Sequence, residues 1–310
     1  MCFPIRSHHF HRPTLVFAKL LAAAALTVGA SAEDPLPPTP TKVSPAAAPL
    51  NRTIEKLGLE LVWIKPGTFV MGSPATETDR HKAEGPQTEV TFTQGFWLGK
   101  TPVTQGQYEA VTGTNPSHFK TVGKDAPVEE VSWVDAMDCC TKLTGQERTT
   151  GRLPEGYAYT LPTEAQWEYV RRAGKTEAYA GNPDTMAWHT GNSDGTTHPV
   201  ATKEANAWGL FDLSGNVLQW CFDWFGDYPG GAVTDPTGPD YGHFRMARGG
   251  SWRMGPELCR SAARAGGSAG RRDYTIGFRL ALSPVRPAAE KNRNAEARPT
   301  RSEGGPPGGY

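Results

Sequence analysis

The side chains of this sequence with the clearest capacity for chemistry are its cysteines. Cys2 lies in an N-terminal leader, which leaves Cys139, Cys140, Cys221 and Cys259 in the mature chain. Thiols form disulfides in an oxidising compartment, and as thiolates they bind soft metal ions such as Cu(I). Adjacent cysteines rarely bond to each other, and on a helix Cys139 and Cys140 point about 100° apart, so at most one of them faces the core.

Other patterns that support catalysis are missing from the sequence. Ser251 stands in Gly-Gly-Ser-Trp without the strand-turn-helix pattern of a nucleophile elbow, and no glycine-rich phosphate loop precedes a helix. The histidines after the leader include no pair four residues apart, the spacing that would favour a zinc or iron site on a helix. These histidines are His81, His118, His189, His198 and His243. Hydrolase, nucleotide and iron or zinc chemistry are therefore not predicted.

Charge and composition narrow the class of protein further. Lys and Arg together number 32, as do Asp and Glu, so the formal net charge is zero. Proteins that bind nucleic acids or anionic membranes usually carry a basic excess, so neither partner is predicted. The 310 residues include 35 Gly and 27 Pro, which favour turns and loops, and 9 Trp and 12 Phe, which supply apolar bulk for a core.

The first 32 residues have the pattern of a secretory signal peptide. Basic residues precede an apolar run over residues 20–30, and Ala30-Ser31-Ala32 offers small side chains for signal peptidase. The run is about eleven residues long, too short to span a bilayer, and an amphipathic or anchoring helix is the alternative. No cysteine follows the run for a lipid anchor. We expect cleavage after segment 1–32, export to the periplasm or the medium, and no transmembrane segment.

The rest of the chain divides into a linker, one domain and a tail. Residues 33–54 are rich in Pro and Ala, a composition typical of semi-extended linkers. Residues 285–310 are charged and rich in Gly and Pro, which predicts a disordered tail. Residues 55–284 show no repeat of 20–50 residues, so this domain is not predicted to be a solenoid or a propeller.

Strand patterns dominate the start of the domain. Two β-rich runs, 59–64 and 68–71, flank Pro66-Gly67 and predict a hairpin. Residues 89–92 alternate polar and apolar side chains, as a half-buried strand does. After Gly174 we find no helical period, and turns joined by short strands are predicted. Loops this long are expected to be functional or to be held by ions and side-chain networks.

Three short helices are predicted from their capping residues. Thr104 and Thr163 each stand three residues before a glutamine, as in a capping box. Ser132 can cap a further helix over residues 133–143. Few helices, a small antiparallel sheet and long ordered loops together define the α+β class.

Eight sequence blocks then follow one another in a recognisable order. They are FVMGS at 69–73, KTPVT at 100–104, PVEEVSWVDA at 127–136, LPTEAQWEY at 161–169, AWGLFD at 207–212 with GNV at 215–217, RGGSW at 248–252, RSAAR at 260–264 and IGFR at 276–279. In this order they resemble the sulfatase-modifying-factor (formylglycine-generating enzyme) family along nearly the whole of residues 55–284. The resemblance implies a loop-rich, C-type-lectin-like α+β fold with small antiparallel sheets and few helices.

The oxidase members of this family convert a sulfatase cysteine to formylglycine, with copper held by two cysteine thiolates five positions apart. Counted from Ser251, the resemblance places Met254 at the first position and Cys259 at the second; counted back from the RSAAR block, Cys259 falls outside the pair. Either way one thiol is missing, so copper of the family's type is not expected. Cys259 stays the catalytic candidate, and a Met254–Cys259 pair is the remaining set of soft ligands.

The resemblance also bears on the disulfides. Cys140 matches a position that is disulfide-bonded in the family, but its partner position holds Leu280. Cys221 and Cys259 lie in loop-rich strands that flank the same glycine turn, and an oxidising compartment favours a bond between them. We therefore expect a Cys221–Cys259 disulfide, with Cys139 and Cys140 as buried helix thiols.

A calcium site near the glycine-asparagine turn is implied as well. Its ligands would be the side chains of Asp212 and Gln219 and the carbonyls of Gly215 and Val217. Oxygen donors at every second or third residue suit Ca²⁺, but Gln219 replaces the family's bidentate glutamate, which predicts weaker binding. The alternative is that Asp212 caps the turn as an Asx residue. A second family site would lie near Asn192 and Asp194, in a segment that is shorter in this chain.

Four residues of the matched blocks are predicted to be structural. Gly249 and Gly250 permit a turn or a close approach that a Cβ would block. Arg264 and Arg279 can each satisfy several carbonyls in an interior with few helices. Ligand binding by either guanidinium is the alternative.

Three classes of function are consistent with these residues. The first is an oxidase acting on exported sulfatases, which the resemblance favours and the missing thiol opposes. The second is a binding or accessory module whose aromatic side chains contact a protein, peptide or glycan. The third, a receptor-like variable protein of the retroelement-diversified type, is disfavoured because residues 245–280 hold few Asn or Tyr. We favour the second and keep the first as the alternative, so enzyme activity stays open.

The aromatic candidates for that contact lie in the loop-rich half of the domain. They are Trp188, Trp220, Trp224, Tyr228 and Trp252. For Trp220 and Trp224 a position in the core is the favoured alternative.

Overall fold

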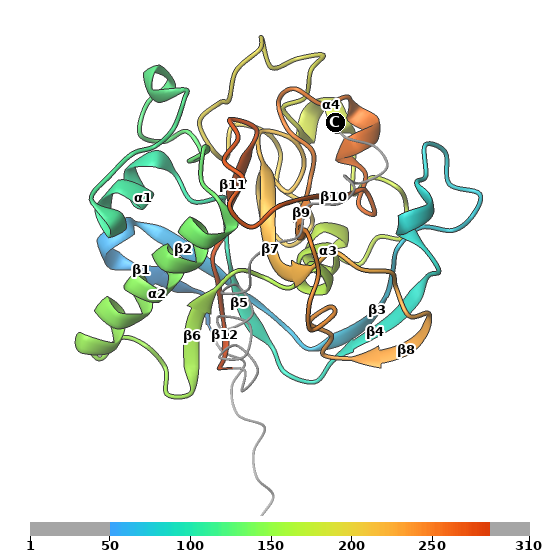
Figure 1. The fold of residues 1–310 in the computed structure, drawn as a ribbon, viewed down its shortest axis with the longest axis horizontal. Coiled ribbons are helices and arrows are strands. Elements are labelled where there is room, and N and C mark those ends of the chain that lie inside the picture. Colours follow the sequence, from blue (N-terminus) through green and yellow to red (C-terminus); the bar gives the residue numbers. More distant parts are fainter. Residues whose placement is uncertain (1–49, 286–310) are drawn as a thin grey trace, which may run out of the picture. The chain divides into compact units, whose positions relative to one another are not determined.

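The computed structural model describes residues 50–285; the signal peptide, most of the linker and the tail expected from the sequence lie outside the described residues. Three small sheets and four α-helices make up this region, joined by long ordered turns and loops (Figure 1). The α+β class and the loop-rich character are confirmed. Within residues 50–285, no helix combines the length and the apolar character needed to cross a bilayer.

The largest sheet has five antiparallel strands in the order β1-β2-β5-β12-β6. In that order they span Arg52–Ile54, Leu59–Ile64, Phe96–Gly99, Ala281–Pro284 and Tyr157–Thr160. β12 therefore lies inside the sheet, hydrogen-bonded to β5 on one side and to β6 on the other. β1 lies within the segment predicted to be linker, so the first strand of the domain begins before residue 55.

Two smaller sheets complete the fold. The sheet β10-β9-β7-β11 comprises Arg264–Gly267, Arg245–Arg248, Leu218–Trp224 and Ile276–Phe278, and the sheet β3-β4-β8 comprises Gly67–Met71, Thr88–Phe92 and Gly231–Thr234. β11 runs parallel to β7, and β8 runs parallel to β4. These two sheets are thus mixed, which corrects the expectation of antiparallel pairing. Parallel partners need a crossover, and the chain between β4 and β8 and between β7 and β11 is long enough for one.

The predicted hairpin around Pro66-Gly67 does not form. β2 pairs with β5, and β3 pairs with β4, so the two runs belong to different sheets. Two β-rich runs beside a turn carry no information about more distant partners, and in this fold each run pairs with such a partner. The strand predicted at residues 89–92 is confirmed as β4.

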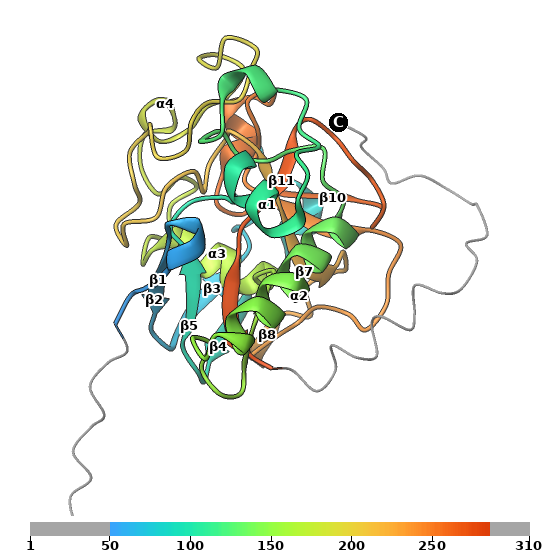
Figure 2. The same cartoon turned by 90° about the vertical axis from the view of Figure 1, so that its left-hand side faces the viewer.

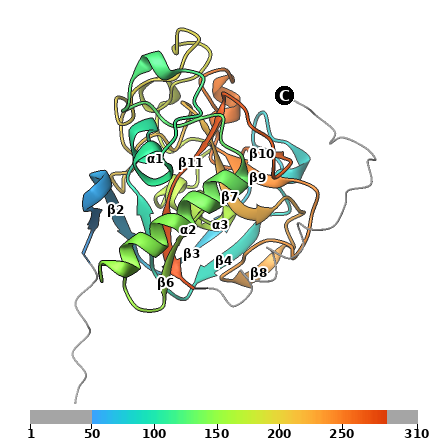
Figure 3. The same cartoon turned by 60° about the vertical axis from the view of Figure 1, so that its left-hand side comes forward.

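The three predicted helices begin at their predicted caps. α1 spans Gln105–Thr112, α2 spans Trp133–Thr149 and α3 spans Glu164–Arg172, each with a reciprocal capping box. α2 is longer than predicted and packs against β6, beside which it lies in Figure 3; Figure 2 shows the same helix from another side. A fourth helix, α4 at Pro183–Met186, was not predicted; it is one turn long and begins at the Asn182 cap. Short 3-10 helices cover Glu55–Leu57, Lys82–Glu84, Lys120–Val122 and Pro256–Cys259.

The interior contains charged side chains as well as apolar ones. Glu168 on α3 and Arg248 on β9 are both fully buried and form an ion pair. The other Glu168 oxygen accepts from Arg172 Nε at 2.8 Å and from the Gly72 backbone N–H at 2.9 Å. One carboxylate therefore joins the α3 helix, the β9 strand and the end of β3.

Candidate functional site

The Gly-Gly turn and Cys259 lie against each other between β9 and β10. Gly249 and Gly250 have φ angles of 106° and 71°, and a Cβ on Gly250 would lie 2.7 Å from the Cys259 sulfur. Cys259 ends the short helix Pro256–Cys259 and is fully buried. Burial raises the pKa of its thiol to about 12. The catalytic candidate from the sequence is thus a protonated, enclosed thiol at neutral pH.

A buried arginine lies beside this thiol. Arg171, on α3, donates from Nη2 to the Cys259 carbonyl oxygen at 3.3 Å, and its side chain is 2% exposed. Its Nε and Nη1 atoms have no hydrogen-bond partner within the described residues. Burial lowers the pKa of Arg171 to about 10, which still leaves a cation at neutral pH. The charge of Arg171 favours the thiolate form of Cys259, but burial has the larger effect and keeps the thiol protonated.

Arg171 was missed in the sequence, although a signal for its position existed. It follows Trp167 by four residues on one helix, so the two side chains share a face. Trp167 is fully buried. The helical spacing therefore placed Arg171 in the interior, whereas the residue type alone suggested the surface.

The expected Cys221–Cys259 disulfide is not formed, because both residues are free thiols. Cys221, on β7, packs in the apolar cluster around Trp167. Cys259 faces the Gly-Gly turn and Arg171 instead. Two segments that lie near the same turn need not be joined by a disulfide, since the bond also requires the two Cβ atoms to point toward each other.

Thiol accessibility is the first testable consequence. Cys139, Cys140, Cys221 and Cys259 are all buried, and burial raises the pKa of every one of these thiols. Cys139 and Cys140 both pack in the largest apolar cluster, which corrects the expectation that at most one of them faces the core. We expect none of the buried thiols to react with an aromatic disulfide reagent at pH ~7.5 in the native protein, and all of them to react in denaturant. Absorbance of the released thiolate gives both counts. A thiol that reacts at full rate in the folded protein contradicts this arrangement.

The residues matched to the family's calcium site form a buried turn before β7. Asp212 and Asn216 have φ angles of 51° and 60°. The Asp212 carboxylate accepts from the Ala201 backbone N–H at 2.7 Å and from Asn216 Nδ2 at 3.3 Å. Burial raises the pKa of this carboxyl. Gly215 lies so close to Trp188 that a Cβ added to Gly215 would be 2.1 Å from the carbonyl oxygen of Trp188.

Gln219 uses both ends of its side-chain amide within the protein. Oε1 accepts from Trp167 Nε1 and from Arg279 Nε, each at 3.0 Å, and Nε2 donates to the Asp212 carbonyl at 2.6 Å. The amide orientation is determined because Trp167 and Arg279 can only donate. A neighbouring guanidinium and an oxygen that already accepts twice do not fit the shell of roughly six to eight oxygens around Ca²⁺. These residues therefore do not fit a calcium site of the family's type.

The second implied site is also occupied by hydrogen bonds of its own loop. Asn192 Oδ1 accepts from the His189 N–H at 2.8 Å, and Asn192 Nδ2 donates to the Ala187 carbonyl at 3.0 Å. Asp194 is exposed and has a φ of 52°. Among residues 50–285, no three His, Cys, Asp or Glu side chains are grouped so that they could hold a metal ion.

The arginines of the matched blocks connect distant segments. Arg264 donates from Nε and Nη2 to the two carboxylate oxygens of Glu164, at 2.6 and 2.8 Å. Arg279 donates from Nη1 to the Gly99 carbonyl and from Nη2 to the Phe211 carbonyl, both at 2.6 Å. Burial lowers the pKa of Arg279 to about 9. Each guanidinium thus satisfies acceptors from separate parts of the chain.

The aromatic candidates lie in four different surroundings. Trp220 is fully buried and donates to the Val131 carbonyl, so it belongs to the core. Trp224 and Tyr228 are nearly buried and line a cleft of about 440 Å³ whose walls include the β8 segment. Trp188 is half-buried and stacks on His198 with ring centroids 3.7 Å apart.

Trp252 is only 8% exposed and packs beneath a cluster of side chains near the surface, which together with it we call the aromatic patch. Its members are His118, Phe119, Trp252, Arg253 and Tyr274. The Phe119 and Trp252 centroids are 5.2 Å apart, and those of Trp252 and Tyr274 are 5.8 Å apart. Arg253 is exposed and lies over the Tyr274 ring at 5.6 Å. The buried Glu129 carboxylate accepts the backbone N–H groups of His118 and Phe119, which holds their loop in place.

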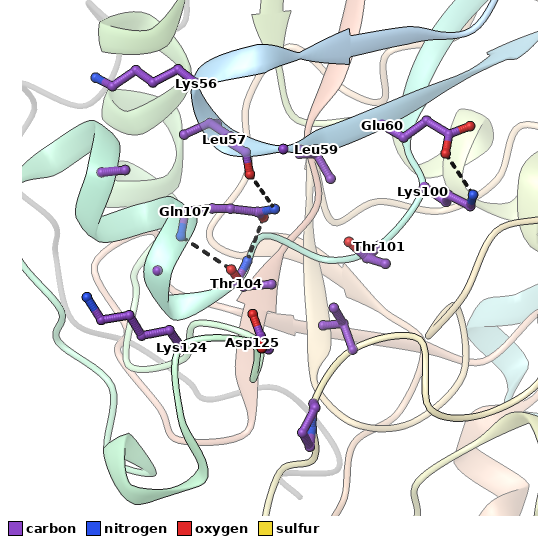
Figure 4. Close-up of a pocket in the computed structure, with 15 residues that line it drawn as sticks. Lys56, Leu57, Leu59, Glu60, Lys100, Thr101, Thr104, Gln107, Lys124 and Asp125 are labelled. Carbon is purple, nitrogen blue, oxygen red and sulfur yellow. Dashed lines mark hydrogen bonds and ion pairs between the residues drawn. The ribbon is translucent and has the colours of Figure 1, made fainter.

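A larger groove of about 590 Å³ lies between the start of α1, the β1–β2 connection and residues 199–200. Figure 4 shows Gln107 joining Thr104 to the Leu57 carbonyl on its wall, and Glu60 paired with Lys100. Two of its lysines pair with residues outside the lining, Lys56 with Gln146 and Lys124 with Glu109.

The sheets, the capped helices and the glycine turn define a domain of the formylglycine-generating-enzyme-like class, with a C-type-lectin-like fold. Residues 48–284 match the family described as "Sulfatase-modifying factor enzyme 1-like domain". The chain therefore belongs to the sulfatase-modifying-factor family, as the order of its sequence blocks indicated.

Relatives in this family carry different names. The chain is 31% identical over 260 residues to the formylglycine-generating enzyme of Thermomonospora curvata, which covers 74% of each protein. It is 32% identical over 204 residues to the chaperone protein LppX of Paenibacillus barcinonensis, covering 51% of this chain and 69% of that protein. Over 242 residues it is 30% identical to the serine/threonine-protein kinase pkn1 of Chlamydia caviae, covering 73% of this chain and 38% of the kinase.

Two solved structures are similar along most of the described region. Treponema denticola variable protein 1 has a TM-score of 0.67 and 28% identity, covering 76% of this chain and 98% of that structure. PvdO from Pseudomonas aeruginosa has a TM-score of 0.64 and 26% identity, covering 75% of this chain and 97% of that structure. Because the named relatives differ in activity, family membership does not by itself define the function.

Proposed function

We propose that this chain is an exported binding or accessory member of the family and does not oxidise cysteine. The observation that carries the proposal is the enclosed thiol of Cys259, whose pKa burial raises to about 12 although Arg171 lies beside it. Copper of the family's type is held by two thiolates, whereas Cys259 is a protonated thiol and Cys221 packs in the apolar cluster around Trp167. Met254 offers a thioether, but its half-buried side chain packs against the largest apolar cluster.

The aromatic patch is the surface that best suits a partner. Trp, Tyr and Arg are the residues that carry most of the binding energy in protein interfaces. The patch combines the half-buried Tyr274 and the exposed Arg253 with the buried ring of Trp252, and it adjoins the Gly-Gly turn along the chain. A protein or peptide segment with an acidic side chain fits this combination of rings and positive charge, and a glycan is the alternative ligand.

Oxidase activity is the second candidate, since the chain resembles a named formylglycine-generating enzyme. The test incubates purified protein with copper, oxygen, a thiol reductant and a peptide containing Cys-X-Pro-X-Arg. We expect no loss of mass in the peptide, whereas the Thermomonospora curvata enzyme forms the aldehyde under the same conditions. Turnover by the wild type that disappears in Cys259→Ser would establish the oxidase instead.

A further inference from the structure

The side-chain amide of Gln219 closes the turn at residues 212–219, at the point where the resemblance to the family implies a calcium ion. We propose that Gln219 makes this turn independent of calcium, because its Nε2 group bonds to the chain at the point where a carboxylate would face the metal. The inference concerns the stability of the fold and stands apart from the proposed binding function.

Both ends of the Gln219 side chain support this assignment. On one side, Oε1 accepts from Trp167 Nε1 and Arg279 Nε, which fixes that oxygen away from the turn. On the other side, Nε2 donates to the Asp212 carbonyl oxygen at 2.6 Å. A glutamate held by the same two donors would present an oxygen to the Asp212 carbonyl, and two oxygens at that distance need a cation between them.

The other groups of the turn are held by N–H donors as well. Asp212 Oδ2 accepts from the Ala201 backbone, and Oδ1 accepts from Asn216 Nδ2. Asn216 also exchanges hydrogen bonds with the His198 backbone, at 3.0 and 3.1 Å. Arg279 supplies the positive charge closest to Gln219. N–H donors and the positive charge of Arg279 thus satisfy the oxygens of this turn, in the place of a divalent ion.

The test compares thermal unfolding in a calcium chelator and in millimolar calcium, for the wild type, Gln219→Glu and the control Gln146→Glu on the surface of α2. We expect the Tm of the wild type and the control to be the same in both buffers. Gln219→Glu is expected to unfold at a lower temperature in chelator, and calcium should raise its Tm by about 5–10 °C.

Terbium luminescence excited through tryptophan gives a second measurement that does not depend on the variant folding. No saturable signal is expected for the wild type. A one-to-one terbium or calcium titration of the wild type that is lost in Asp212→Asn would overturn the inference. So would a folded Gln219→Glu variant whose Tm ignores calcium, because the amide would then not stand in the place of a metal.

Discussion

Replacing Glu168 with glutamine is expected to lower the free energy of unfolding by about 3–5 kcal/mol. Glu168 and Arg248 are both fully buried, and Arg172 shares the same carboxylate. Glutamine keeps the volume but removes the charge, so Arg172 loses its anion and Arg248 keeps only the longer pair with Glu164 at 3.4 Å. Urea unfolding followed by tryptophan fluorescence measures the change in the midpoint.

The control for this experiment is a carboxylate of the same type at the surface. Glu109→Gln breaks the pair with Lys124, whose side chain is 81% exposed, and should change stability by less than about 0.5 kcal/mol. Equal losses in Glu109→Gln and Glu168→Gln would show that burial of the pair adds nothing. Such a result would contradict a stabilising role for the ion pair between α3 and β9.

Gly215→Ala is the second substitution with a large expected effect, a loss of about 3 kcal/mol. Gly215 has a φ of 67°, and an added Cβ would lie 2.1 Å from the Trp188 carbonyl oxygen. The clash is with backbone, so a side-chain rotation cannot relieve it. Chemical denaturation of the purified variant measures the loss.

Gly195→Ala separates the strain from the clash. Gly195 has a φ of 74°, but nothing lies within 4 Å of the position of its Cβ. Only the left-handed backbone is penalised there, by about 1–2 kcal/mol. If the two alanine variants lose the same stability, the close approach of Trp188 to Gly215 is not real.

The local features of the fold were predictable from the sequence, and the distant pairings were not. Thr104, Ser132 and Thr163 each cap a helix as predicted, because a capping box depends on four consecutive residues. The hairpin prediction failed because β2 and β3 take partners from different sheets. Strand patterns show which residues pair, but they do not identify the partner strand.

In the candidate site, too, the local features were predictable from the sequence and the contacts between distant segments were not. The sequence showed that only one thiol follows the Gly-Gly turn, and that Gln219 replaces a carboxylate. The direction in which the Gln219 amide points depends on Trp167 and Arg279, which are 52 and 60 residues away. Arg171 beside Cys259 likewise joins segments 88 residues apart. Motif matching identified the positions, whereas only the packing revealed their partners.

The place of β12 in the middle of the five-stranded sheet has a consequence for biosynthesis. Residues 281–284 form the last strand along residues 50–285, so they leave the ribosome after all the other strands. Until then β5 and β6 have no common neighbour. The sheet is therefore completed only after nearly all of the domain has been translated. A nascent chain that is still incomplete at this end stays open along two strand edges, which leaves backbone groups of β5 and β6 unpaired.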